Sequence, residues 1–195
     1  EAQKNGCTIT PIDAMINHNT CEVFFNNVPI PASALIGEEG RGFRYILDGM
    51  NAERCLTAAE AIGSGRYFVE KAVNYANERT VFNRPIGQNQ GIQFPIAQGH
   101  AQLEAADLMV RKACAMFDAG LPCGGEANMA RLLAAEASWQ CAEACFSTHG
   151  GFAFAREYDI ERKWRETRLS RTAPISTNLI LGYVGQHILG MPKSY

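Results

Sequence analysis

The sequence predicts a mainly α-helical chain, an antiparallel bundle of the four-helix type preceded by a short β-rich segment. Apolar residues recur every three or four positions over long stretches, as they do on the buried face of a helix. Turns rich in Gly and Pro separate these stretches, and short connections between helices favour antiparallel neighbours. Near the N-terminus, short β-branched and aromatic runs predict strands instead.

Composition limits the class of protein further. Of the 195 residues 47% are hydrophobic and 19% charged, which is a globular composition able to bury a core without disulfides. The 18 Lys and Arg against 20 Asp and Glu leave a net charge of −2, without the basic surplus that broad nucleic-acid binding requires. Residues 172–192 lack charged side chains, but proline, glycine and polar residues interrupt them, so we expect a buried helix and no membrane span.

Seven cysteines are scattered along the chain without a CxxC pair. Such a pattern predicts buried thiols and no bound metal. It is typical of a reducing compartment, so we expect a cytoplasmic bacterial protein or one of the mitochondrial matrix.

The first 38 residues differ from the rest. CTIT at 7–10 and CEVFF at 21–25 predict strands, and the two prolines of VPIP at 28–31 exclude a helix there. This segment is too small to form a stable β domain alone. We therefore expect residues 1–38 to be the end of a β domain and residues 39–195 to be a helical bundle domain.

The helices follow from periodicity and from the residues that end them. They are expected at about 41–78, 92–117, 126–147, 159–167 and 175–189. The first begins with an apolar stripe at Phe43, Ile46, Leu47 and Met50. Pro85 separates it from the second, and Gly150 and Gly151 end the third.

The second helix has the clearest pattern, with an apolar or small residue every 3.5 positions, as in a packed bundle. This seam consists of Ile92, Ile96, Gly99, Leu103, Ala106, Val110, Ala113 and Phe117. The small residues in it predict the close approach of a neighbouring helix.

Glu53 is the first candidate for chemistry. No cation lies three or four positions from it in the first helix, so no local ion pair is expected, and Arg54 likewise lacks a helical partner. An unpaired Glu among apolar and small residues suits a general base. A solvated Glu on an outer face is the commoner explanation of the same pattern.

Two further segments are candidates for ligand binding. Arg79 either completes a charged helix end or holds a phosphate. Residues 147–151, Ser-Thr-His-Gly-Gly, either cap a helix or form a turn that a flat or phosphorylated ligand can approach. No GxGxxG or P-loop motif is present, so neither a Rossmann nor a Walker site is expected.

Four segments, in this order, resemble the acyl-CoA dehydrogenase family. They are residues 28–55 (VPIPASALIGEEGRGFRYILDGMNAERC), 75–97 (YANERTVFNRPIGQNQGIQFPIA), 148–168 (THGGFAFAREYDIERKWRETR) and 173–182 (APISTNLILG). The resemblance implies the end of a middle β domain followed by the whole C-terminal helical domain. The family's N-terminal domain and most of its middle domain would be missing, so the chain alone is expected to be inactive.

The resemblance also implies a reaction of fatty acid metabolism. Family members hold FAD, and a Glu removes the α-proton of an acyl-CoA thioester while the β-hydrogen leaves to the flavin, forming a trans-2-enoyl-CoA. The electrons then pass to electron-transfer flavoprotein. Because FAD is held across subunits in this family, the resemblance implies a homodimer or a homotetramer.

The position of the base follows from two segments. Most members carry the Glu in a Y-E-G-T segment before the last helix, where this sequence has Pro174. A minority, similar to isovaleryl- and long-chain acyl-CoA dehydrogenases, carry it in an x-x-E-R segment of the first bundle helix, and residues 51–54 read Asn-Ala-Glu-Arg. The resemblance thus implies Glu53 as the base, with Asn51 and Arg54 contacting acyl-CoA.

The FAD residues are implied in the same way. Arg79, Phe82 and Gln90 match positions that hold the FAD of a neighbouring subunit. The turn formed by Ser147, Thr148, His149, Gly150 and Gly151 matches one that packs against that FAD, with Ser147 where Gln is usual. Ser176 and Asn178 match a Thr and a Gln near the flavin, and Asn83 stands where Gly is usual.

Other functions stay open on this fold. An acyl-CoA oxidase or a flavin monooxygenase would share it, because a fold does not determine a reaction. A retained Glu53 favours proton abstraction over monooxygenation. A non-catalytic oligomerisation bundle is the third alternative, and failure to bind flavin would favour it.

Overall fold

The computed structural model describes residues 6–16 and 19–194. Residues 1–5, 17–18 and 195, which fall within the two predicted domains, lie outside the described residues. The chain divides into two compact units, Glu1–Gly49 and Met50–Tyr195. The predicted domain boundary at residue 38 stays a prediction.

The first unit contains a two-stranded antiparallel hairpin. Strands β1 (Cys7–Ile12) and β2 (Thr20–Phe25) pair with Cys7 opposite Phe25 and Ile12 opposite Thr20, which confirms the two predicted strands. A short 3₁₀ helix, η2 (Ala32–Ala34), follows the extended prolines. Every described residue of β2 is exposed, and a two-stranded hairpin is marginal by itself.

Helix α1 (Gly42–Glu78) leads into the second unit. There the short strands β3 (Thr80–Val81) and β4 (Arg84–Pro85) form a tight hairpin, followed by η3 (Ile86–Gln88). Two long helices come next, α2 (Gln90–Asp118) and α3 (Gly124–His149). The last elements are η4 (Gly150–Phe154), η5 (Arg156–Tyr158), α4 (Ile160–Leu169), α5 (Thr177–Tyr183) and the π-helical turn η6 (Val184–Ile188).

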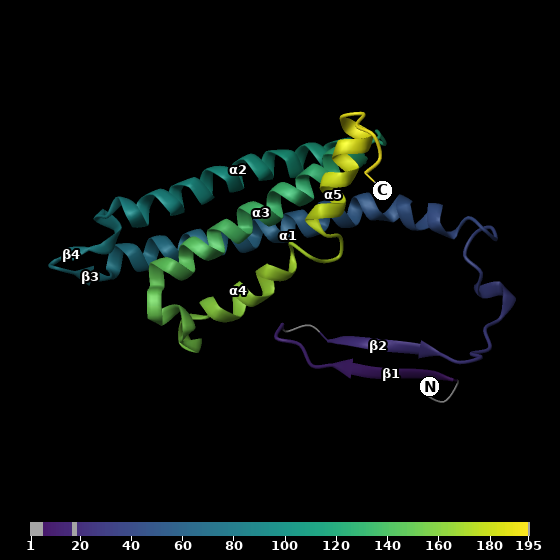
Figure 1. Ribbon diagram of the computed structural model, residues 1–195, viewed down its shortest axis with the longest axis horizontal. Helices are drawn as coiled ribbons and strands as arrows, with labels where there is room; N and C mark the ends of the chain where they lie inside the picture. The colour runs from purple at the N-terminus through teal and green to yellow at the C-terminus, as the bar shows by residue number, and fades with distance from the viewer. Residues whose placement is uncertain (1–5, 17–18, 195) are drawn as a thin grey trace. The chain divides into compact units, whose positions relative to one another are not determined.

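In the second unit α1, α2 and α3 run alongside one another, with α2 antiparallel to the other two, and α4 and α5 lie against α3 (Figure 1). The mainly α-helical fold class is therefore confirmed, and each predicted helix is present. The last predicted helix differs in one respect, because it ends in the π-helical turn η6. Within the described ranges, no helix is long and apolar enough to cross a membrane.

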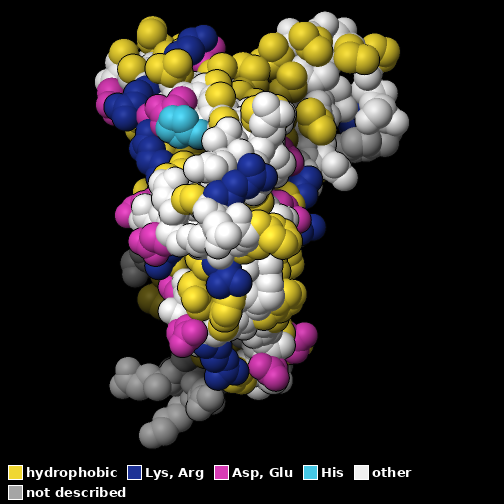
Figure 2. Space-filling model, turned by 90° about the vertical axis from the view of Figure 1, so that its left-hand side faces the viewer, with side chains coloured by type: hydrophobic (Ala, Val, Ile, Leu, Met, Phe, Trp, Pro, Cys, Tyr) yellow, Lys and Arg dark blue, Asp and Glu magenta, His cyan; other side chains and the backbone are white. Residues whose placement is uncertain are grey.

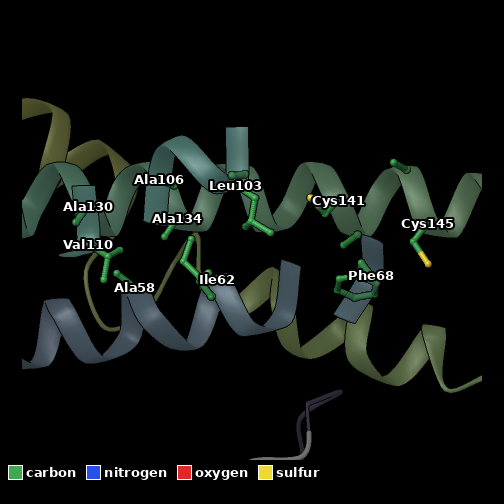
Figure 3. Packing of buried hydrophobic residues seen from close by; sticks show 14 of the residues in the cluster. Ala58, Ile62, Phe68, Leu103, Ala106, Val110, Ala130, Ala134, Cys141 and Cys145 are labelled. Atoms are coloured by element: carbon green, nitrogen blue, oxygen red, sulfur yellow. The ribbon is translucent and has the colours of Figure 1, made fainter. Parts of the chain in front are cut away.

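The core lies between the three long helices. Ile62 and Phe68 of α1, Leu103 of α2 and Cys141 and Cys145 of α3 point into it (Figure 3). Most of the predicted seam is buried, as expected, but Ile92 is half-buried and Phe117 is 43% exposed. These two lie near the ends of α2, where fewer neighbouring side chains cover them.

The predicted close approach of the helices is confirmed at two glycines. A Cβ on Gly99 of α2 would lie 3.0 Å from Cys141 Sγ of α3, and one on Gly65 of α1 would lie 2.5 Å from Leu103 Cδ1. A side chain at Gly65 would therefore displace Leu103 from the core.

Two predictions about burial were wrong. Phe43 and Ile46 are 75% and 61% exposed, because the first turns of α1 belong to the first unit and the buried stripe of α1 starts only at Cys55. Cys21 is also exposed, on the uncovered strand β2, and Cys114 is half-buried. The other five cysteines are buried as expected, and all seven are free thiols.

Candidate functional site

One end of the bundle contains a pocket of about 520 Å³, which we call the turn pocket. It is lined by Tyr75, Arg79, Val81, Ile86, Thr148, His149, Gly150, Gly151 and Phe152. These residues come from the end of α1 and the residue after it, from β3 and η3, and from the end of α3 and η4. The fold thus brings Arg79 together with five residues that lie about 70 positions further along the chain.

Two glycines open the turn at the end of α3. Gly150 has a φ of +57°, a conformation that residues with a side chain rarely adopt. A Cβ added to Gly150 or Gly151 would meet no atom within 4 Å, so the backbone faces open space. A ligand could approach the main chain closely at both residues.

His149 is held inside the turn. Only 4% exposed, it stacks on the Tyr75 ring at a centroid distance of 4.2 Å. Its Nδ1 lies 2.9 Å from the Cys145 carbonyl oxygen, so Nδ1 carries the proton and donates a hydrogen bond to that oxygen. Burial lowers the pKa of His149, with the hydrogen bond to Cys145 acting the other way. The ring is therefore neutral near pH 7.

Thr148 is likewise engaged within the chain. Its hydroxyl donates to the Ala144 carbonyl at 2.7 Å. The side chains of Thr148 and His149 thus stabilise the end of α3, and the main chain at Gly150 and Gly151 is left open to a ligand. The positive charge of the pocket comes from Arg79, whose guanidinium lies 5.9 Å from the Phe152 ring centroid. Among the residues that the structure describes, no carboxylate pairs with Arg79.

The three remaining residues predicted for this end are exposed. Phe82 is 94% exposed at the tip of the β3–β4 hairpin, with a φ of +51°. Gln90 begins α2 and is exposed. Ser147 lines a second hollow of about 240 Å³, together with Gly91 and Thr148 among others. Figure 2 views the molecule from this side, where hydrophobic, basic and acidic side chains are interspersed.

Glu53 lies on an exposed face of α1, and no cation pairs with it in the described part of the chain. Arg54 does have a helical partner, contrary to expectation, because its Nη1 donates to Asn51 Oδ1 at 2.9 Å. The expectation counted only charged partners, whereas the partner is the side-chain amide of Asn51, three positions before Arg54. Arg54 Nε is buried and has no hydrogen-bond partner among the described residues. The guanidinium therefore keeps an unused donor.

The start of α3 lies close to Asn51 and to the end of α5. A Cβ on Gly124 would lie 3.1 Å from the Tyr183 hydroxyl and 3.9 Å from Asn51 Nδ2. Ser176 is the N-cap of α5, and its Oγ accepts the Leu179 N–H at 3.4 Å. Asn178 is exposed in the first turn of that helix.

The candidates on and beside α1 lie in two places, with Asn51, Glu53 and Arg54 near the start of the second unit and the turn pocket at the C-terminal end of the helix. Glu53 and the end of α1 at Glu78 are 25 residues apart, or about 38 Å at the rise of an α-helix. One small molecule cannot contact both ends. In the described ranges, no cluster of three or more potential metal-binding side chains is present.

Sequence analysis missed Tyr75, Phe152 and the buried Arg131. Tyr75 precedes Arg79 by four positions, and this spacing on one helix face could have identified it. Arg131 stands inside the apolar run MARLLAA, where a charge is an exception that could have been noticed. Phe152 had no local signal, because its neighbours come from α1 and η5.

Comparisons with known proteins give a consistent result. Residues 40–187 match the family described as "Acyl-CoA dehydrogenase, C-terminal domain". The chain is 38% identical over 194 residues to the acyl-CoA dehydrogenase FadE12 of Mycobacterium tuberculosis, covering 97% of this chain and 50% of that protein. It spans about half the length of the curated relatives it matches.

Two solved structures are similar as well. A glutaryl-coenzyme A dehydrogenase in complex with glutaryl-CoA superposes with a TM-score of 0.91 at 30% identity, over 97% of this chain and 49% of that one. PigA with FAD and proline superposes with a TM-score of 0.90 at 27% identity, over 95% of this chain and 49% of that one.

Proposed function

The chain belongs to the acyl-CoA dehydrogenase family, whose C-terminal domain it contains, and we propose that it forms part of an FAD-dependent acyl-CoA dehydrogenase. Such an enzyme oxidises an acyl-CoA thioester to a trans-2-enoyl-CoA. The observation that supports this most is the turn pocket, in which Arg79 and the Thr148–Gly151 turn converge from distant parts of the chain.

The residues of the turn pocket suit FAD in their chemistry. Arg79 offers an unpaired guanidinium suited to a phosphate, and the bare main chain at Gly150 and Gly151 admits a bulky group. Tyr75 and Phe152 add aromatic surface beside them. In our proposal Phe82, Gln90 and Ser147 extend this surface. Ser176 and Asn178 contact the flavin of the FAD that is bound at the other end of the bundle, near Glu53.

The chain's own residues have distinct roles in the proposed reaction. The Glu53 carboxylate takes the α-proton of the thioester, and the Arg54 guanidinium, oriented by Asn51, contacts the acyl-CoA. When bound, FAD supplies the two-electron oxidation chemistry. Glu53 is exposed here, so the remaining half of the enzyme must exclude water from it.

The distance of about 38 Å between the two groups supports a shared cofactor site. In this proposal one copy holds its own FAD near Glu53 and contacts a second copy's FAD at the turn pocket. A homodimer or a homotetramer follows, because each site is incomplete without a second chain. Electron-transfer flavoprotein would accept the electrons, in the cytoplasm of a bacterium or in the mitochondrial matrix.

An anaerobic absorption spectrum of the full-length protein tests the proposal. Adding a panel of acyl-CoAs should bleach the oxidised flavin band with at least one of them and so name the substrate class. Free proline, the compound present with FAD in PigA, is the comparison compound. A flavin that stays oxidised with every acyl-CoA would contradict the proposal, and a protein without flavin would favour the oligomerisation bundle. Fast reoxidation by oxygen would indicate an oxidase.

A further inference from the structure

The strongest unexplained feature of the bundle is a buried cation. Arg131 lies in α3 and is only 2% exposed, in a helix whose buried face consists largely of alanine and cysteine. No carboxylate lies within ion-pair distance of it in the described part of the chain. A buried charge is costly unless hydrogen bonds compensate it. Burial accordingly lowers the pKa of Arg131, and the negative charge of Glu60 partly opposes this.

The hydrogen bonds of Arg131 all go to one segment. Its Nη2 donates to the main-chain carbonyl of Ser170 and to that of Ala173, the latter at 2.8 Å. Both residues belong to the connection between α4 and α5. The guanidinium thus links α3 to a loop about 40 positions further along the chain. We call this pair of hydrogen bonds the clamp.

The clamp completes the hydrogen bonding of this connection. The last carbonyls of a helix have no partner within the helix and need one elsewhere. The carbonyls of Thr167, Arg168 and Leu169 accept main-chain N–H groups of the following residues. The carbonyls of Ser170 and Ala173 accept hydrogen bonds from Arg131. A positive charge also suits the C-terminal end of α4.

Three residues after Ala173 the chain reaches Ser176, the N-cap of α5. Farther along α5, Ile180 is 1% exposed and holds the helix on the bundle. Ile180 thus packs the middle of α5 on the bundle, whereas Arg131 is bonded to the segment that leads to its start. Ser176 and Asn178 lie at the start.

We propose that Arg131 is a positioning residue, which holds the Ser170–Ala173 segment and thereby sets where Ser176 and Asn178 lie against the flavin. The part about flavin rests on the proposed function. The part about the segment does not. A purely stabilising role is disfavoured, because apolar residues often replace buried charges without loss of stability. An apolar residue, however, cannot donate hydrogen bonds to the two carbonyl groups.

The experiment compares Arg131→Met with Arg131→Lys in the full-length, FAD-loaded protein. Amide hydrogen exchange is measured at Thr172 and Ala173, whose N–H groups donate to the Leu169 carbonyl. The Met variant should exchange about 10- to 100-fold faster at these two amides, as expected when charge-assisted hydrogen bonds are lost. The Lys variant keeps a cation with several donors and should restore most of the protection.

A matched control removes the other link between α3 and this segment. Arg171 Nε donates to Glu136 Oε1 at 2.9 Å, and both side chains are partly exposed. Glu136→Ala should therefore change exchange at Thr172 and Ala173 by about fivefold at most, as for a surface ion pair. An equal effect of Glu136→Ala and Arg131→Met would contradict a specific clamp.

The flavin is the second readout. Arg131→Met should change the visible circular dichroism of the bound flavin, and Arg131→Lys should restore it. Unchanged exchange, or equal acceleration of the α2 amides, would overturn the clamp. Faster exchange with an unchanged flavin signal would overturn the positioning role. If the Met variant does not fold, Arg131→Gln must show the same local acceleration. A wild-type protein without flavin would overturn the proposed function, while the exchange result would still decide the clamp.

Discussion

The two ends of α1 differ in how much of a site this chain supplies. At the C-terminal end, the turn pocket is lined by residues of α1, β3, η3, α3 and η4, and the side chains of Thr148 and His149 already have hydrogen-bond partners. Near the N-terminal end of the second unit, Glu53 is exposed and unpaired among the described residues. The first region is preorganised by packing. The second holds Glu53, the proposed base, which needs further structure around it to lie in a site from which water is excluded.

The largest expected effect comes from removing the reactive group. In the full-length protein, Glu53→Gln should lower the rate of flavin reduction by acyl-CoA about 10²- to 10⁴-fold, because a positioned acid–base group contributes this much. Bound FAD should remain, because the turn pocket is untouched. Anaerobic stopped-flow absorbance measures both. Glu70→Gln, an exposed Glu on the same helix, should reduce at the wild-type rate. A wild-type rate for Glu53→Gln would place the base elsewhere.

A smaller effect is expected from straining the turn. Gly150→Ala introduces a side chain at a φ of +57°, where such strain costs about 1–3 kcal/mol. FAD should bind about 10- to 100-fold more weakly, as measured by titration of the apoprotein. Gly120→Ala is the matched control, with a φ of +67° and no atom within 4 Å of its added Cβ, away from the pocket. If both variants weaken FAD equally, the effect is general destabilisation and the turn has no special role.

The smallest expected effect concerns pH. Burial lowers the pKa of His149, so the unfolded chain binds a proton at higher pH than the folded chain does. The contribution of neutral His149 to the free energy of unfolding is therefore fully present above about pH 6.5, the ordinary pKa of His. It decreases as the pH drops below that value. Urea unfolding between pH 7.5 and 5 should show this loss.

His149→Gln should flatten that pH dependence over the same range. His100 provides the control, since it is exposed, and His100→Gln should keep the wild-type slope. An unchanged slope in His149→Gln would mean that another group causes the loss. A flattened slope would support the contrast between the two ends of α1, because a buried neutral histidine is part of what preorganises the turn pocket.

Much of the fold could be predicted because the information is local. The apolar seam of α2, the break at Pro85 and the glycines at 150 and 151 each act within a few residues of themselves. The candidate site was harder. Glu53, Arg79 and the 147–151 turn could be named, largely through resemblance, but no pattern along the chain could say that Arg79 and Gly150 share a pocket.

Local patterns in the sequence thus predict the helical fold class, the helices and their order, because periodicity and chain breakers act locally. Glu53 as the base came from the family resemblance and stays a prediction. Tertiary structure alone decided that His149 is a buried, neutral ring stacked on Tyr75, and that Arg131 grips a loop about 40 positions away. It also decided that Phe43 is exposed in spite of its apolar stripe. These properties depend on which distant groups meet, and only the packed chain brings them together.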